Sequence, residues 1–180
     1  MVNEENRKVA APGRNARGTQ AAVRIMDAFK KEIDYGALAE QIRALTAGVP
    51  YPVANMANVS ALLFQSLPKA SWAGFYLLED GCLILGPFQG KPACIRIPLG
   101  KGVCGTAAAE DRTILVPDVH AFPSHIACDP DSRSEVVIPI RKNGCVTGVL
   151  DIDSRELSAF TKEDADGLER CVRAMEEKIF

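Results

Sequence analysis

The chain has 180 residues, of which 47% are hydrophobic and 24% charged, and its formal net charge is -2. This length and composition predict a single globular domain with a core of its own, and they exclude a chain that is disordered throughout. No run approaches the roughly 18 apolar residues of a membrane span, no secretory signal is present, and basic residues do not alternate with aromatic ones. We therefore expect a cytoplasmic protein with no membrane or nucleic-acid partner.

The first 20 residues differ in composition from the rest of the chain. They lack apolar periodicity and are rich in Gly, Pro, Asn and Arg, which is typical of a segment without fixed structure. We expect a flexible leader over residues 1–20 and a single domain over residues 21–180.

Three helices are predicted at the start of this domain. Apolar residues recur at helical intervals over three segments, residues 22–31, 35–46 and 53–67. In the second segment Leu38, Ile42 and Leu45 form one face, and Pro68 ends the third. The broad apolar stripe of the third segment would also permit a homodimer.

Short apolar or alternating runs separated by Gly and Pro follow, and they predict a sheet. Six strands are expected, over residues 72–78, 82–88, 94–98, 113–116, 135–140 and 145–151. Gly81 and Gly144 belong to turn sequences that favour tight hairpins. A short Ala-rich helix is expected over residues 102–110, and Thr161 resembles the N-cap of a terminal helix that runs to Lys178. This order predicts an α+β fold: a central, mostly antiparallel six-stranded sheet with helices packed on it.

The segment from residue 117 to residue 134 is too long for an idle connection in a compact domain. It carries Cys128 and both histidines of the chain, His120 and His125. The six cysteines form no C-x-x-C pair, and two histidines give no zinc-binding spacing. We therefore expect neither a structural metal nor a cofactor.

Six ordered fragments carry a resemblance to a known family. They are SWAGFYLL, LGPFQGKPAC, GKGVCGTAA, DVHAFPSHIACD, SEVVIPI and GVLDIDS. In this order they resemble the GAF-domain free methionine-(R)-sulfoxide reductases over residues 35–172. Most diagnostic are three cysteines that ordinary GAF modules do not carry together, Cys94, Cys104 and Cys128. The resemblance implies a GAF-like fold and a thiol-dependent enzyme that reduces free L-methionine-(R)-sulfoxide to methionine.

Sulfoxide reduction needs a soft nucleophile at sulfur and a proton donor at oxygen. Cys128 is the best thiolate candidate, because its small neighbours Ser124 and Ala127 let a ligand approach the backbone; the alternative is a buried packing residue. The resemblance implies that Cys94 resolves the sulfenic acid of Cys128 as an intramolecular disulfide, with Cys104 as an alternative partner. Without the resemblance, Cys104 is better explained by packing. Thioredoxin is the implied reductant of the disulfide.

Three acids and two aromatic residues are candidates for substrate binding. Asp151 and Asp153 are two apart and share one face of a strand, and Glu135 begins the strand that pairs with it. Clustered carboxylates raise one another's pKa, so one could stay protonated and donate to the sulfoxide oxygen while another holds the substrate ammonium. The alternative is a solvated strand end. The resemblance implies that Trp72 and Tyr76, four apart on one strand, wall the pocket; a core anchor is the alternative for Trp72.

Two other functions are compatible with these residues. One is a GAF sensory module that binds a small molecule without chemistry, and the other is a redox switch whose cysteines form disulfides without a small substrate. The first predicts inert thiols, and the second predicts oxidation by peroxide that does not depend on methionine sulfoxide.

Overall fold

The structure, a computed structural model, describes residues 33–179 of the chain. The leader expected over residues 1–20 and the helix expected over residues 22–31 lie outside this range. Within the described range the chain forms one compact unit. The domain start predicted at residue 21 stays a prediction.

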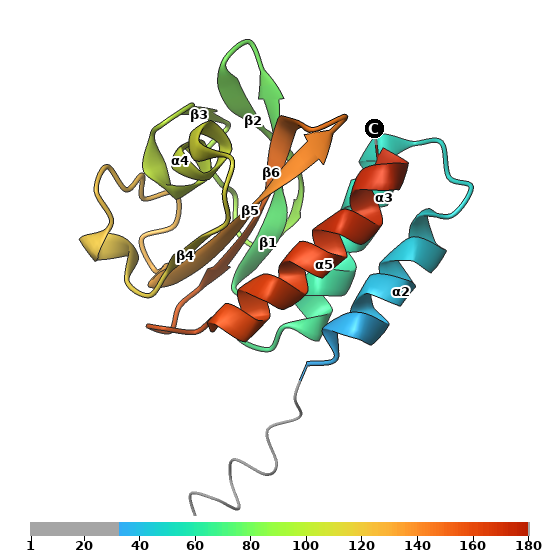
Figure 1. Cartoon of the computed structure of the whole chain (residues 1–180). Helices are drawn as coiled ribbons and strands as arrows, with labels where there is room; N and C mark the ends of the chain where they lie inside the picture. The colour runs from blue at the N-terminus through green and yellow to red at the C-terminus, as the bar shows by residue number, and fades with distance from the viewer. Residues whose placement is uncertain (1–32, 180) are drawn as a thin grey trace, which may run out of the picture. The chain divides into compact units, whose positions relative to one another are not determined.

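Three helices lie on one side of a sheet: two of them pack on the strands, and the first in chain order packs against those two (Figure 1). They are α2 (Tyr35–Thr46), α3 (Pro52–Ser66) and α5 (Lys162–Ile179). Their bounds agree with the predicted helices to within one residue. The start of α5 has reciprocal capping, because the Asp164 amide donates to Thr161 Oγ1 while the Thr161 amide donates to Asp164 Oδ2. None of the helices among residues 33–179 combines the length and apolar character that a membrane span needs.

All six predicted strands form one antiparallel sheet in the order β3-β2-β1-β6-β5-β4. They are β1 (Trp72–Glu79), β2 (Cys82–Gln89), β3 (Arg96–Pro98), β4 (Ile114–Val116), β5 (Ser134–Lys142) and β6 (Cys145–Ser154). The α+β prediction is confirmed. The largest differences are that β3 begins two residues later and β5 ends two residues later than expected, and that β6 continues to Ser154. β6 is longer because Asp153 pairs with residues of two neighbouring strands.

The opposite face of the sheet is covered by α4 (Gly102–Glu110), whose bounds match the prediction, and by the connection that follows β4 (Figure 1). A Cβ atom on Gly105 would overlap the carbonyl oxygen of Pro98 in β3, so a glycine is needed for α4 to lie this close to the strand. The connection contains one 3-10 turn, Val119–Ala121. The sheet therefore separates two apolar clusters, one on each face. α4 lies on the face that also carries the three predicted acids.

The apolar stripe of α3 packs inside the domain. Met56, Val59 and Leu63 are buried in the cluster formed with α2, α5 and the sheet. A homodimer built on this helix would have to use exposed residues such as Tyr51 and Val53 instead.

Candidate active site

Sheet register brings the three predicted acids to one face. Glu135 of β5 lies opposite Asp153 of β6, and Asp153 lies opposite Trp72 of β1. Directly opposed residues point to the same side of a sheet, and Asp151 shares that side because it is two residues from Asp153. Glu135 and Asp151 are each only 6% exposed and Asp153 is half-buried, so the acids do not form a solvated strand end.

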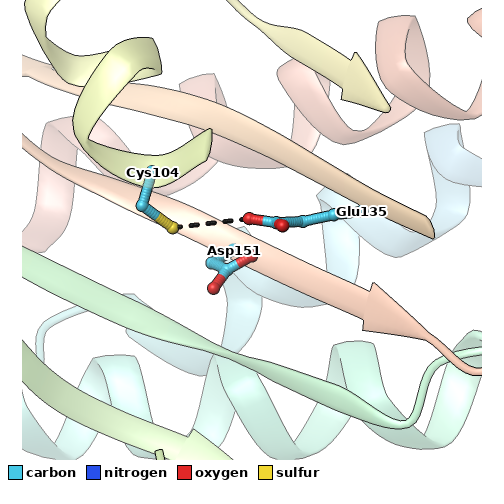
Figure 2. A group of neighbouring side chains, drawn as sticks. All are labelled: Cys104, Glu135 and Asp151. Atoms are coloured by element: carbon cyan, nitrogen blue, oxygen red, sulfur yellow. Dashed lines mark hydrogen bonds between the residues drawn. The ribbon is translucent and has the colours of Figure 1, made fainter. Parts of the chain in front are cut away.

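Cys104 reaches the same cluster from α4. Figure 2 shows its side chain directed at Glu135, with Asp151 beside both. The Cys104 thiol donates to Glu135 Oε1 over 3.7 Å, and the residue is buried. Cys104 is therefore more than apolar packing, because its sulfur lies among carboxylates.

Burial dominates the electrostatics of this cluster. It raises the pKa of Glu135 well above its usual range, and the charges of Asp151 and Asp153 add to the effect. Burial also raises the pKa of Asp151 to about 6, and burial with the charge of Asp151 raises the pKa of Asp153. The Cys104 thiol has a raised pKa for the same reasons, burial first and then the charges of Asp151 and Glu135. Burial therefore favours the protonated forms of these groups, as a proton donor requires.

Stability should depend on pH through Asp151. A carboxyl whose pKa is higher in the folded state stabilises the fold below its unfolded pKa, and this contribution is lost as the pH rises through the folded pKa. Since the pKa of Asp151 rises from 3.8 to about 6 on folding, ionisation of this residue lowers the free energy of unfolding near pH 7 by about 3 kcal/mol. We expect Asp151→Asn to gain about that much relative to the wild type between pH 4 and pH 7.

Urea unfolding of both proteins at the two pH values measures this gain. Glu110→Gln, which changes an exposed acid at the end of α4, is the control and should follow the wild type. If the free energies of unfolding of Asp151→Asn and the wild type changed equally between the two pH values, Asp151 would not have the raised pKa assigned to it.

A disulfide joins Cys94 and Cys128, whose Cα atoms are 5.3 Å apart. It ties the segment before β3 to the long connection before β5. Lys91 holds the same two segments together, since its Nζ lies 2.7 Å from Asp131 Oδ2 and 3.2 Å from Asp129 Oδ1. The structure thus pairs the two cysteines to which the resemblance assigned attack and resolution.

Trp72 and Tyr76 are both buried below this segment. Their rings stack with centroids 5.9 Å apart, which places them on one face of β1 as expected. The Trp72 indole nitrogen donates to the carbonyl oxygen of Lys91 over 3.1 Å, and the Tyr76 hydroxyl donates to that of Cys94 over 3.0 Å. These bonds hold the backbone that carries Cys94. Contact of either ring with a substrate stays a prediction.

A small pocket opens between α4, the long connection and the acidic cluster. Its lining residues are Ile97, Gly102, Val103, Cys104, His125, Ile126, Cys128, Asp129, Ser132, Glu135, Asp151 and Asp153. Five predicted site residues are brought together in this wall, whereas Cys94, Trp72 and Tyr76 are outside it.

Sequence reasoning missed Asp129 and Ser132 as wall residues. Asp129 directly follows Cys128, and its Oδ1 accepts from the Asp131 amide over 3.0 Å, so this carboxylate orders the turn beside the sulfur. The Asp-Pro-Asp run was the available signal, because Asp and Pro favour such turns.

The other three cysteines lie away from this pocket. Cys82 and Cys171 are buried, whereas Cys145 is exposed at the start of β6. Cys145 therefore offers a matched control for thiol substitutions.

Comparison with known proteins decides the family. A model of the GAF domain family matches residues 53–179. The free methionine-R-sulfoxide reductase of Escherichia coli is 51% identical over 145 residues, which cover 81% of this chain and 88% of that protein. The chain belongs to the GAF-domain family of free methionine-R-sulfoxide reductases.

Solved structures of this family have the same fold. The reduced form of the Staphylococcus aureus fRMsr is 47% identical with a TM-score of 0.80, and the match covers 83% of this chain and 97% of that one. The free methionine-R-sulfoxide reductase of Neisseria meningitidis, solved in complex with its substrate, is 43% identical with a TM-score of 0.78. That match covers 81% of this chain and 87% of the other.

Proposed function

We propose that this chain reduces free L-methionine-(R)-sulfoxide to methionine. The observation that carries the proposal is the Cys94–Cys128 disulfide beside a pocket whose wall contains buried carboxylates, in a chain of this family. A redox pair and a proton-holding cluster in one pocket are what sulfoxide reduction requires.

The proposed reaction begins with Cys128 as a thiolate. Its sulfur attacks the sulfoxide sulfur while a carboxyl gives a proton to the oxygen, so methionine leaves and Cys128 becomes a sulfenic acid. The Cys94 thiol then attacks the Cys128 sulfur, which releases water and forms the disulfide. Two thiols lose two electrons in forming the disulfide, and the sulfoxide gains two in becoming the sulfide, so the electrons balance.

The acids have different environments and therefore different proposed tasks. Glu135 has a pKa raised well above its usual range and accepts a hydrogen bond from Cys104, so it is the proposed proton donor. Asp153 is half-buried at the pocket wall and is the proposed partner of the substrate ammonium, and Asp151 lines the same wall two residues before it. We propose that Trp72 and Tyr76 support the site by holding the Cys94 segment and wall the methylsulfinyl end of the substrate.

The disulfide must be reduced between turnovers, and thioredoxin is the proposed donor. A dithiol reductant attacks one sulfur and leaves as its own disulfide, which returns both cysteines to thiols. Such recycling belongs in a reducing compartment, so we propose a cytoplasmic enzyme. A homodimer stays a proposal that would have to use residues outside the buried stripe of α3.

Epimer-resolved turnover tests the proposed function. The full chain is incubated with dithiothreitol and equal amounts of free methionine-R-sulfoxide and methionine-S-sulfoxide, and chromatography separates the products. We expect loss of the R-epimer with an equal yield of methionine, and no loss of the S-epimer. A reduced chain that consumes neither epimer would favour a ligand-binding GAF module, and peroxide-driven disulfide formation without turnover would favour a redox switch.

Replacing the resolving cysteine should separate the first turnover from the later ones. In Cys94→Ser, Cys128 can still attack, so we expect one methionine per chain in a single-turnover assay. Recycling by thioredoxin should fall by about 100-fold or more, because a sulfenic acid without its partner offers no disulfide to reduce. Rapid-quench yields and steady-state rates of the same preparations give both quantities. Undiminished thioredoxin-dependent turnover would show that another thiol resolves Cys128.

A further inference from the structure

We propose that the pocket contains a binding site for a thiophilic divalent cation such as Zn²⁺, formed by Cys104, Glu135 and Asp151, and that a bound cation blocks sulfoxide reduction. The cation is neither a structural metal nor a cofactor here. The blocking part rests on the proposed function, whereas the binding part rests on the geometry alone.

The ligand atoms have the spacing of a metal site. Cys104 Sγ lies 3.7 Å from Glu135 Oε1, and one atom from each of the three side chains lies within 4.8 Å of the others. A tetrahedral Zn²⁺ with Zn–S of about 2.3 Å and Zn–O of about 2.1 Å separates its sulfur and oxygen ligands by about 3.6 Å. One thiolate, two carboxylates and a fourth position open to the pocket therefore fit this cation with small side-chain movements (Figure 2).

A carboxylate oxygen of Asp151 without a hydrogen-bond partner among residues 33–179 also favours cation binding. Asp151 is 6% exposed, and within the described chain its buried Oδ1 has no partner in hydrogen-bond geometry. A buried polar atom without a partner carries a desolvation cost. A cation held between Asp151 and the other two ligands would remove that cost.

Charge also favours a cation over an empty acidic cluster. The Cys104 thiol meets the carboxyls of Glu135 and Asp151 in this part of the pocket wall, and Asp153 lines the pocket beside them. Burial disfavours their anionic forms, so the cluster holds protons in place of a positive charge. A divalent cation can displace the protons of the thiol and the carboxyls and neutralise the anions that result.

The site does not depend on the redox pair. Cys94 and Cys128 are joined in this structure, while Cys104 is a free thiol. The three ligands come from α4, β5 and β6, and this explains why no metal-binding spacing occurs in the sequence. In the oxidised chain, any sulfur ligand in the pocket must therefore be Cys104.

Cobalt absorption tests the binding part. The full chain with its disulfide intact is titrated with Co²⁺ in the absence of thiol reductants, and Zn²⁺ is then added. We expect a sulfur-to-cobalt charge-transfer band that saturates at one Co²⁺ per chain and disappears when Zn²⁺ is added. Absence of that band from the wild-type protein overturns the proposal.

Three variants locate the site. Cys104→Ser should abolish the charge-transfer band, and Asp151→Asn should keep it while weakening Zn²⁺ affinity by about 10-fold or more. Cys145→Ser, which removes the exposed thiol, should leave the band and the affinity unchanged. Circular dichroism verifies folding; if Cys104→Ser does not fold, the Asp151→Asn affinity decides alone. A band that survives in folded Cys104→Ser, or is lost in Cys145→Ser, contradicts the site.

Single-turnover inhibition tests the blocking part. Pre-reduced chain, freed of reductant, is mixed with methionine-R-sulfoxide with and without Zn²⁺ at roughly 10 times the measured Kd. The rate of methionine formation should fall by about 10-fold in the wild type, in proportion to site occupancy. Equal fractional inhibition of Cys104→Ser, relative to its own metal-free rate, contradicts blocking at this site. Absence of methionine from metal-free wild type would instead refute the proposed function and leave the cobalt result standing.

Discussion

Cys128→Ser should lose essentially all sulfoxide reduction, with a single-turnover rate at least about 1,000-fold below that of the wild type. A serine hydroxyl is a far weaker nucleophile toward sulfur than a thiolate, and it cannot form a sulfenic acid. Cys128 lines the pocket together with Glu135 and Asp151, and unlike Cys104 it forms a disulfide with Cys94. Rapid-quench measurement of methionine formed by the pre-reduced variant gives the rate.

Cys145→Ser is the matched control for this experiment. It removes one thiol at an exposed position of β6 and should retain the wild-type rate. Methionine formation by Cys128→Ser at the wild-type rate would exclude Cys128 as the nucleophile.

Glu135→Gln is expected to have the second largest effect, a fall in kcat of about 100-fold to 10,000-fold. The glutamine keeps the size of the side chain but cannot transfer a proton to the sulfoxide oxygen. Burial raises the pKa of Glu135 well above its usual range, which favours the protonated carboxyl that can donate. Steady-state rates with saturating methionine-R-sulfoxide measure the change.

The pH profile separates proton donation from a merely structural role. A donor acts while protonated, so the wild-type rate should fall as the pH rises through the pKa of Glu135, and Glu135→Gln should lack that decline. Glu110→Gln, at the exposed end of α4, should keep the wild-type profile. A Glu135→Gln enzyme with nearly full kcat would remove Glu135 from the proton-transfer step.

The sequence predicted most of the sheet because its local signals agree with the final pairing. Both hairpins have an Asp-Gly or Asn-Gly turn, and Asp80 and Asn143 adopt the positive φ that such turns need. The alternation of residues along β6 placed Asp151 and Asp153 on one face before any contact was known. The convergence of the acids could therefore be predicted from strand periodicity and one hairpin.

Contacts between distant segments could not be predicted in the same way. The approach of Cys104 to Glu135 depends on how closely α4 lies on β3, and that distance is set by Gly105 against Pro98. The hydrogen bonds of Trp72 and Tyr76 to the Lys91–Cys94 backbone also follow from tertiary packing. The resemblance implied a role for Cys94, but the residues alone did not indicate what holds it near Cys128.

The sequence left a packing role open for both Cys104 and Trp72, and the structure bears on each of them differently. Packing alone does not describe Cys104, because its thiol also donates a hydrogen bond to the buried carboxylate of Glu135. A core-anchor role for Trp72 agrees with its burial, and its indole nitrogen also holds the segment before Cys94. In both cases burial and function coincide, which periodicity alone cannot reveal.

The most direct test of the account is a single turnover with peptide mapping. Pre-reduced full chain, freed of reductant, is mixed with excess methionine-R-sulfoxide, quenched and analysed by mass spectrometry. We expect one methionine per chain, the loss of two thiols and a Cys94–Cys128 disulfide. Methionine formed without that disulfide, or no methionine at all, would contradict it.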